Sequence, residues 1–347
     1  MHSLQVRSSN NSYLFRKKIL RKLKTTLPYE AFCFTTVDPH TLLSTGAITD
    51  ERIELLHPEL FENEYIEQDI NRYSCLLNEK TYCNTLYEGT KGELSSSKRF
   101  HKILSPAKFH DELRAVLVHK ERCYGFLTLF RTQEQGFFSL EDIAYMKRSI
   151  PSIAKGLKDS IYQSYQTSKM IHAASVETGI IILNQDFEII STNQTGIHLV
   201  EWLRQQENIE NHQLPRPIRA ICSQVTSSFS TNNSKVIVHA FNQLFMSITA
   251  SPLLTSSSQI ALLIERIRPR EMNRLLVELF DLTKREHELV EELLKGNSTK
   301  MIADKLYISS YTVQDHLKSI FNKTGVNSRR ELIGKINTFY NELHVEY

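Results

Sequence analysis

Three side chains near the carboxy end, at positions 314, 315 and 318, could together recognise a polar surface. Gln314 has an amide that donates and accepts hydrogen bonds, Asp315 has a carboxylate that accepts, and Lys318 has an ammonium that donates. Such groups can together pair with the donors and acceptors of a polar partner. Residues three and four apart are neighbours on a helix. A helical segment would therefore place Gln314 and Asp315 beside Lys318.

The residues before this set have the pattern of a first helix. Thr283 and Glu286 have the spacing of a capping box, in which each side chain bonds a backbone amide at the start of the helix. Gly296 readily adopts the left-handed conformation that ends a helix. The apolar positions between them recur at helical spacing: Leu289, Val290, Leu293 and Leu294.

Two more helices follow, separated by a tight turn. The first opens around Ser298, and residues 307–309 leave room for only a short turn, which is helix-turn-helix spacing. Ser309 can cap the next helix, and Gly325 with Val326 fits its carboxy-terminal cap. The inward positions of that helix are Val313, Leu317, Ile320 and Phe321. Its outward positions are Tyr311, Gln314, Asp315, Lys318 and Asn322.

A fourth helix is predicted from Ser328, again with a glutamate, Glu331, three residues later. Its apolar stripe is larger than one small bundle needs. We therefore predict a dimer interface along it, formed by Leu332, Ile336, Phe339 and Tyr340.

The segment from Leu282 to Leu332 resembles the LuxR-type helix-turn-helix domain of bacterial transcription regulators. The matching positions include Leu282, Thr283, Arg285, Glu286, Gly296, Ser298, Lys300, Ile302, Ala303, Leu306, Ile308, Ser309, Thr312, Val313, His316, Leu317, Ile320, Lys323, Gly325, Val326, Ser328, Arg329 and Glu331. The resemblance implies that Gln314, Asp315 and Lys318 contact base edges in the major groove of DNA. Such groups can bond adenine, the amino group of cytosine, and guanine or phosphate, respectively. We expect contacts to the DNA backbone, which carry no sequence information, from Lys300, Ser310, Tyr311, Thr312, Asn322 and Lys323.

One departure from the family pattern concerns the first two base-reading positions. Many family members have a basic residue at one of them, whereas this chain has Gln314 and Asp315. Asp315 has two alternative roles: accepting a bond from cytosine, or repelling phosphate and so narrowing the set of tolerated sites.

Charge gives a milder indication of the same partner. Residues 298–335 contain seven Lys or Arg and three Asp or Glu, a balance of +4, whereas the whole chain has 42 against 39. A single domain of this kind contacts few bases, so we expect a homodimer on paired half-sites of double-stranded DNA. RNA polymerase is a further candidate partner of a transcription regulator.

Composition limits what the remaining residues can be. A chain of 347 residues with 41% hydrophobic content can form two or three packed domains. We find no apolar run near the roughly 18 residues of a membrane span and no signal-peptide core. The five cysteines include no C-x-x-C pair, which indicates a reduced, cytoplasmic chain.

The first half of the chain has the element order of a GAF domain, a cytoplasmic small-molecule sensor. A basic amphipathic helix leads into a predicted hairpin of strands 31–37 and 42–47. We expect the charges of this helix to form a solvated face, the alternative being an accessory contact to DNA or to a membrane. After a polar, partly helical middle, strands 111–119 and 123–131 precede a helix capped at Ser139. We expect that helix to be interrupted at Pro151 and to end near residue 168.

The next region has the element order of a PAS domain. Strands 179–183 and 187–191 precede two helices and a meander of three strands, 235–240, 244–250 and 259–267. No cofactor is predicted, because the sequence contains no cofactor signature. An unidentified small ligand in the GAF-like or PAS-like domain stays open, as does the alternative that the amino-terminal half binds only another protein.

The predicted fold is multidomain α+β, with GAF-like and PAS-like sensor domains followed by an all-α four-helix domain. Its parts are residues 1–158 (GAF-like, with the basic helix), 159–175 (helical linker), 176–268 (PAS-like), 269–281 (connector helix) and 282–347 (helix-turn-helix). An enzyme is not expected, because the motifs G-x-x-x-x-G-K-[ST], G-x-S-x-G and H-E-x-x-H do not occur. A phosphorylated receiver domain is not expected either, because the first 150 residues lack its acidic cluster.

Overall fold

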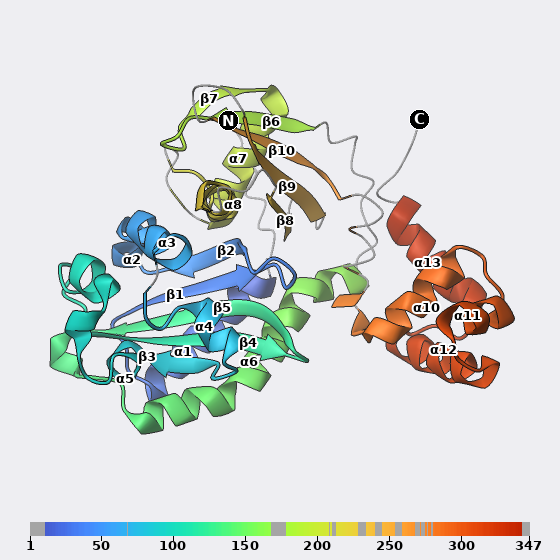
Figure 1. Cartoon of the computed structure of the whole chain (residues 1–347), viewed down its shortest axis with the longest axis horizontal. Coiled ribbons are helices and arrows are strands. Elements are labelled where there is room, and N and C mark those ends of the chain that lie inside the picture. The colour runs from blue at the N-terminus through green and yellow to red at the C-terminus, as the bar shows by residue number, and fades with distance from the viewer. Residues whose placement is uncertain are drawn as a thin grey trace, which may run out of the picture. The chain divides into compact units, whose positions relative to one another are not determined.

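The computed structural model describes residues 11–67, 69–167, 178–207, 209, 213–227, 234–239, 245–253, 259–267, 271, 275, 277–278 and 280–341. The chain divides into two compact units, Met1–Gln163 with Glu177–Glu265, and Ser164–Val176 with Arg266–Tyr347. Among these described residues, the first unit contains two five-stranded sheets and the second contains a helical bundle (Figure 1). The predicted multidomain α+β class is therefore confirmed, whereas the predicted boundaries inside the first unit stay predictions.

The first sheet is antiparallel, with the order β2-β1-β5-β4-β3. Its strands are β1 (Ala31–Val37), β2 (Ser44–Thr49), β3 (Cys83–Thr85), β4 (Asp111–His119) and β5 (Arg122–Arg131). Two long helices pack on one face: α1 (Asn11–Thr26) and α6 (Leu140–Thr167). Short helices cover the other face: α2 (Glu51–Leu55), α3 (His57–Tyr65), α4 (Tyr73–Asn78), α5 (Leu86–Gly89), η1 (Leu94–Ser96) and η2 (Phe100–Leu104). A further short turn, η3 (Gln133–Gln135), follows β5.

Two glycines allow these layers to approach closely. A Cβ atom on Gly125 of β5 would lie 2.7 Å from Leu157 Cδ2 of α6, and one on Gly156 would lie 2.5 Å from Phe15 Cζ of α1. Contacts that short do not occur, so any larger residue would push the helices away from the sheet and from each other.

The predicted interruption of α6 at Pro151 is wrong, because the helix is continuous from Leu140 to Thr167. Proline removes one backbone hydrogen bond. Burial of Ile150, Ile153, Ala154 and Leu157 holds the turns on both sides of it in place.

The expectation of a fully solvated basic face on α1 is also wrong in one position. Arg16 is 5% exposed, and its Nη1 atom donates a 3.0 Å hydrogen bond to Phe34 O of β1. Burial lowers the pKa of Arg16 to about 10. Lys18, Arg21 and Lys22 are exposed, as expected.

The second sheet has the order β7-β6-β10-β9-β8. Its strands are β6 (Gly179–Leu183), β7 (Ile189–Thr192), β8 (Ser234–His239), β9 (Phe245–Pro252) and β10 (Ile260–Arg266). Two helices, α7 (Gln194–Glu207) and α8 (Arg216–Ser227), lie between β7 and β8 in the chain and pack on the sheet. The predicted order of two strands, helices and a three-stranded meander is confirmed.

A buried junction, formed by Arg216, Arg219, Thr49, Glu54 and His57, joins α8 to β2, α2 and α3 within the first unit. Arg216 is 2% exposed, and its Nη2 atom donates to Thr49 Oγ1 at 2.7 Å and pairs with Glu54. Its Nε atom lies 3.4 Å from His57 Nε2. Arg219 Nη2 lies 3.2 Å from Glu54 Oε1. Charged groups with so little exposure are stable only when paired, so these residues tie the two sheets together.

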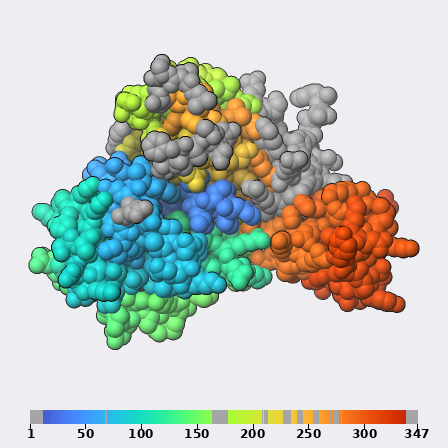
Figure 2. All heavy atoms as spheres, in the orientation of Figure 1, coloured from blue at the N-terminus to red at the C-terminus, as the bar shows by residue number. Residues whose placement is uncertain are grey.

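The second unit contains a bundle of α10 (Lys284–Leu294), α11 (Thr299–Leu306), α12 (Ser310–Thr324) and α13 (Arg329–Asn341). Figure 2 draws this bundle in orange and red. Its core is built from fully buried side chains: Leu289, Val290, Ile302, Val313 and Ile320. The predicted linker 159–175 is helical as far as Thr167 and lies outside the described residues from 168 on. In the predicted connector, residues 271, 275, 277, 278 and 280 are helical and the other residues before Asp281 lie outside the described residues.

Candidate nucleic-acid interface

The start of α12 is fixed by a cap that the sequence predicted. Ser309 Oγ accepts a 3.0 Å hydrogen bond from Thr312 N, and Gly325, at a φ of 66°, ends the helix. Val313 and Ile320 are fully buried and Leu317 nearly so, which fixes the rotation of the helix about its axis. The opposite face of α12 is therefore held outward.

The predicted base-reading residues lie together on that outward face. Gln314 is exposed, and the side chains of Asp315 and Lys318 are 77% and 76% exposed. Lys318 Nζ lies 3.6 Å from Asp315 Oδ1. A pair this exposed contributes about 0–1 kcal/mol, so either partner can leave it for another hydrogen bond at little cost.

The residues predicted to contact the DNA backbone divide into two groups. Lys300, Ser310, Tyr311 and Asn322 are exposed, and Tyr311 is 81% exposed. Thr312 is half-buried, and its hydroxyl lies 2.9 Å from Ser309 Oγ. All of these residues are thus at least partly accessible to solvent.

Lys323 differs from that group, because it already has partners inside the bundle. Its Nζ atom lies 2.6 Å from Glu286 Oε2 and donates to Asp281 O at 3.1 Å. Glu286 also accepts from Thr283 N at 2.6 Å and from Ser319 Oγ at 2.7 Å. Lys323 therefore fastens the end of α12 to the start of α10, and a role in contacting phosphate stays a prediction.

Burial raises the pKa of Glu286, but hydrogen bonds from Lys323, from the Thr283 amide and from Ser319 outweigh burial and hold the net pKa below its usual value. The carboxylate is consequently charged at neutral pH and completes an ion pair with Lys323. A capping box was predicted here, but the reach of Lys323 across 37 residues was not, because no sequence spacing indicates it.

The residues predicted to form a dimer interface are placed only in part. Leu332 and Ile336 are 1% and 2% exposed, so within this chain they pack inside the bundle. The side chains of Phe339 and Tyr340 lie outside the described residues. The interface along α13 stays a prediction.

Sequence reasoning missed a second group of basic residues that are paired on the bundle surface. Glu292 lies 2.5 Å from Lys295 Nζ and 2.8 Å from Lys305 Nζ. Hydrogen bonds from these two lysines lower the pKa of Glu292 to about 2. The spacing of Glu292 and Lys295 is the helical neighbour spacing, and that signal could have shown that Lys295 has a partner.

A cluster of buried charges inside the first sheet region was also missed. This interior charge cluster consists of Arg99, Arg114, Glu64 and Glu112. Glu64 Oε2 lies 2.6 Å from Arg114 Nη2 and 3.3 Å from Arg99 Nη2, and Glu112 lies 3.5 Å from Arg99. Burial lowers the pKa of Arg114, but Glu64 and Tyr73 outweigh burial and the net pKa is raised. One feature of the sequence could have indicated this cluster: Arg114 is a charged residue within the otherwise apolar segment 113–117.

The cavity lined by Glu64, Arg99 and Arg114 of this cluster holds about 70 Å³. Small-molecule sites in proteins are typically about 300–1,000 Å³, whereas a water occupies about 30 Å³. Side chains therefore fill most of the interior beneath α3 and α4.

The capped α12, its tight turn after α11 and its polar outer face define a helix-turn-helix protein. Residues 281–335 match the model of bacterial regulatory proteins of the luxR family. Spore germination protein GerE of Bacillus subtilis (strain 168) is 42% identical over 52 residues, which are 15% of this chain and 70% of GerE. Transcriptional regulatory protein LnrK of the same organism is 46% identical over 54 residues, which are 16% of this chain. The chain belongs to the luxR family of bacterial regulatory proteins.

The matched segment spans only 24% of the length of LnrK. Among solved structures, a phage VqmA in complex with DPO is 21% identical, covering 48% of this chain and 84% of that chain with a TM-score of 0.26. A GAF domain/HD domain protein from Geobacter sulfurreducens is 15% identical, covering 42% and 91% with a TM-score of 0.32. The family assignment therefore depends on the bundle.

Within the described residues, no helix combines the length and the apolar character required to cross a membrane. The same residues include no group of three or more His, Cys, Asp or Glu side chains that could hold a metal ion.

Proposed function

We propose that this chain is a cytoplasmic transcription regulator without enzymatic activity, and that α12 binds double-stranded DNA sequence-specifically. The observation that supports this most is the outer face of α12, where Gln314, Asp315 and Lys318 are exposed on a helix fixed by a cap and a buried side. An α-helix fits the major groove, and these three groups can bond base edges there.

We further propose that two copies bind together. One helix-turn-helix reads few base pairs, and paired copies read half-sites about 10–10.5 base pairs apart or a multiple of that spacing. We expect α13, with Phe339 and Tyr340 among its residues, to form part of the contact between copies.

Selection from a randomised duplex library by the purified full chain tests the proposal. Enriched duplexes should share two similar half-sites at helical spacing, and enrichment should fall steeply between about 50 and 200 mM salt. Recovery of single half-sites would contradict pairing, and recovery of random sequence would contradict specific binding.

Gln314→Ala tests the base-reading assignment. We expect the variant to lose about 1–3 kcal/mol of binding free energy at the preferred site and to tolerate other bases at one position, because one bidentate contact is lost. Fluorescence anisotropy with the selected duplex, with single-base variants of it and with random duplex measures both effects.

Lys300→Ala is the matched comparison, because Lys300 is exposed at the start of α11 and is expected to contact phosphate. This variant should weaken all duplexes alike and reduce the log-log salt slope by about 0.9. Equal losses on selected and random DNA for Gln314→Ala would contradict its role in reading bases.

The connector before α10 is proposed to carry the signal to the DNA-binding bundle. Leu275, Val277 and Phe280 are buried, and Lys335 Nζ of α13 lies 5.3 Å from the centre of the Phe280 ring. A change in how the connector packs would thus reach α13, the helix proposed to pair the two copies. Control of this kind requires that the signal bind two states with different affinities.

Leu275→Asp is expected to weaken both dimerisation and DNA binding, because it places a charge in a buried apolar position. Analytical ultracentrifugation and anisotropy on the same samples measure the two effects. Leu55→Asp is the control, since Leu55 is 75% exposed. If Leu275→Asp changed neither quantity, the connector would not be the route of control.

A second candidate concerns the first sheet region alone. Its interior is occupied by the interior charge cluster, which leaves only about 70 Å³. This observation favours a region that binds another protein over one that encloses a small ligand beneath α3 and α4. Native mass spectrometry of the purified chain distinguishes them, because an enclosed ligand would add a constant mass.

A further inference from the structure

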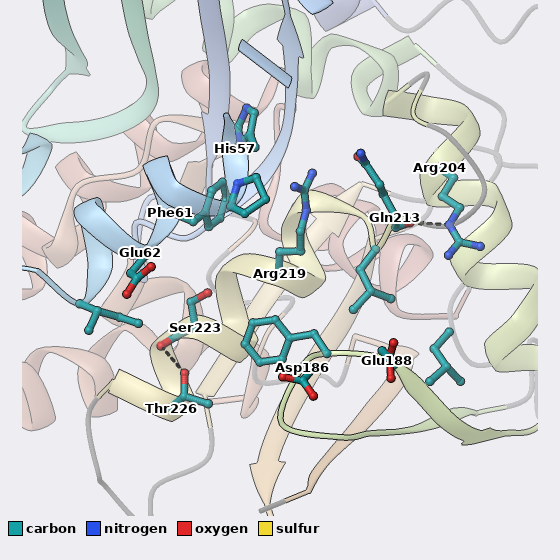
Figure 3. A pocket seen from close by; sticks show the side chains of 15 residues that line it. His57, Phe61, Glu62, Asp186, Glu188, Arg204, Gln213, Arg219, Ser223 and Thr226 are labelled. Carbon is teal, nitrogen blue, oxygen red and sulfur yellow. Dashed lines mark hydrogen bonds between the residues drawn. The ribbon is translucent and has the colours of Figure 1, made fainter. Parts of the chain in front are cut away.

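A larger cavity lies within the first unit, between α3 of the first sheet region and the helices of the second. It holds about 620 Å³, within the range of about 300–1,000 Å³ that is typical of small-molecule sites. Figure 3 shows Phe61 from α3, Arg219 from α8, Arg204 from α7 and Glu188 from the turn before β7 around this space. The cavity is distinct from the filled interior beneath α3 and α4.

Three residues that line this cavity have buried polar atoms without a hydrogen-bond partner among the described residues: Arg219 Nε, Gln213 Oε1 and His57 Nδ1. Burial and the nearby Arg219 lower the pKa of His57 to about 3, so its ring is neutral. Because Arg216 Nε donates to His57 Nε2, the ring proton is on Nδ1. Buried polar atoms are almost always paired in native proteins, so these atoms indicate a missing partner.

The acidic and the basic residues that line the cavity differ in their exposure to solvent. The acidic residues that line it, Glu62, Asp186 and Glu188, are exposed to solvent. The arginines are more enclosed: the Arg219 side chain is 14% exposed, and Arg204 is half-buried with its Nε atom 2.6 Å from Gln213 O. Water screens the acids more strongly than the arginines. Arg219 is already paired with Glu54, whereas Arg204 has no carboxylate at ion-pair distance among the described residues. Arg204 is therefore the charge that most favours an anion in the enclosed part of the cavity.

Apolar side chains form much of the remaining lining: Pro58, Phe61, Ile66, Phe187, Ile189 and Leu214. A ligand that is charged over its whole surface would place charge against these apolar walls, which is unfavourable. An apolar ring with one anionic group matches both parts of the lining, since sites of this type bury an apolar body and orient it with few polar groups.

We propose that this cavity binds a small aromatic monoanion, with its ring against Phe61 and Leu214 and its carboxylate toward Arg204 and Arg219. Arg219 also bonds Glu54 in the buried junction, so a bound carboxylate would compete with Glu54 for it. Occupancy would thereby change the contact between the two sheets. An effect of this change on DNA binding rests on the proposed function. Binding of the ligand in the cavity does not depend on that proposal.

Titration calorimetry of the full chain without DNA tests the site, with 1-naphthoate as the probe and neutral 1-naphthamide as its match. We expect 1-naphthoate to bind at least about tenfold more tightly, because a carboxylate forms charge-assisted bonds with guanidinium groups and the amide does not. Equal affinities, or no binding of 1-naphthoate up to about 10 mM, would overturn the proposal.

Two sets of variants locate the bound anion. Arg204→Gln should remove most of the preference for 1-naphthoate. Ile66 is exposed at the mouth, so Ile66→Glu should weaken binding of 1-naphthoate and Ile66→Lys should strengthen it, each by about threefold or more. Leu55→Glu, away from the lining, should change nothing. If both Ile66 variants bind 1-naphthoate as the unaltered chain does, the anion is bound elsewhere and the site is refuted.

Because these titrations contain no DNA, they can succeed while the DNA-binding proposal fails. A separate measurement adds 1-naphthoate to the complex with the selected duplex. Unchanged DNA affinity at saturating 1-naphthoate would refute the link between the two sites and leave the cavity as a binding site.

Discussion

Glu64→Ala is expected to destabilise the first unit by about 3–5 kcal/mol, the cost of removing one partner from a buried ion pair. Glu64 is the only described acidic partner of Arg114 at ion-pair distance, and it also pairs with Arg99. Both arginines are at most 3% exposed, so water cannot replace the lost carboxylate. Arg114 additionally lies 3.7 Å from the centre of the Tyr73 ring, and its displacement would disturb that packing.

Urea unfolding followed by far-ultraviolet circular dichroism measures this effect as a lower midpoint of the transition of the first unit. Glu59→Ala is the matched control, because Glu59 is exposed on the same helix and should change stability by at most about 0.5 kcal/mol. Glu64→Gln keeps an acceptor and should fall between the two. A Glu64→Ala midpoint equal to that of the control would show that the interior charge cluster does not stabilise the fold.

Glu286→Ala is expected to have the largest effect on the helix-turn-helix bundle, about 2–4 kcal/mol of unfolding free energy. The change removes the half of the α10 capping box in which the Glu286 carboxylate accepts from Thr283 N, and it leaves Lys323 and Ser319 without their carboxylate partner. Because Lys323 fastens α12, the variant should also bind DNA more weakly at temperatures where the bundle remains folded.

The pH dependence gives an independent check on Glu286. Its pKa in the folded chain is lowered below the usual value of 4.5, so the stability that it contributes is present above that value and is lost as pH falls through the folded pKa. The unaltered bundle should therefore lose stability on acidification, and Glu286→Ala should lose less. Glu288→Ala, which breaks a surface pair with Arg285, should follow the unaltered chain. Identical acid profiles for all three proteins would contradict the assigned role.

Local signals predicted the bundle well. The capping box of Thr283 and Glu286, the cap at Ser309 and the stop at Gly325 all depend on residues within four positions of each other, and all are confirmed. At Ser328 the prediction was half correct. Ser328 Oγ accepts from Glu331 N, but the Glu331 side chain bonds the amide of Asn327 instead of Ser328.

The predicted cap at the start of α6 is confirmed. Ser139 and Asp142 exchange both hydrogen bonds of a capping box, although aspartate replaces the usual Glu or Gln. Strands with regular alternation were placed within a few residues. β3 was not predicted, because three residues that pair only with β4 carry no periodic signal of their own.

Contacts between distant segments could not be predicted from spacing. Arg114 meets Glu64 across 50 residues, and Arg216 meets Thr49 across 167. The sequence does not show whether a charged side chain is solvated or buried, because its burial depends on segments that are distant in the chain. The cavity beside Arg219 was missed for this reason, since its lining comes from four separate segments.

The buried junction limits how the two sheet regions can be exchanged between proteins. Cutting after residue 158 would leave Glu54 without Arg216 and Arg219, and the second sheet region alone would expose those two arginines. Chimeras that join either sheet region to a foreign effector should therefore aggregate or misfold, whereas a graft of residues 11–267 as one cassette should remain intact. Gene fusions and recombination would therefore be expected to move the two sheet regions together, because neither region keeps its buried charges paired without the other.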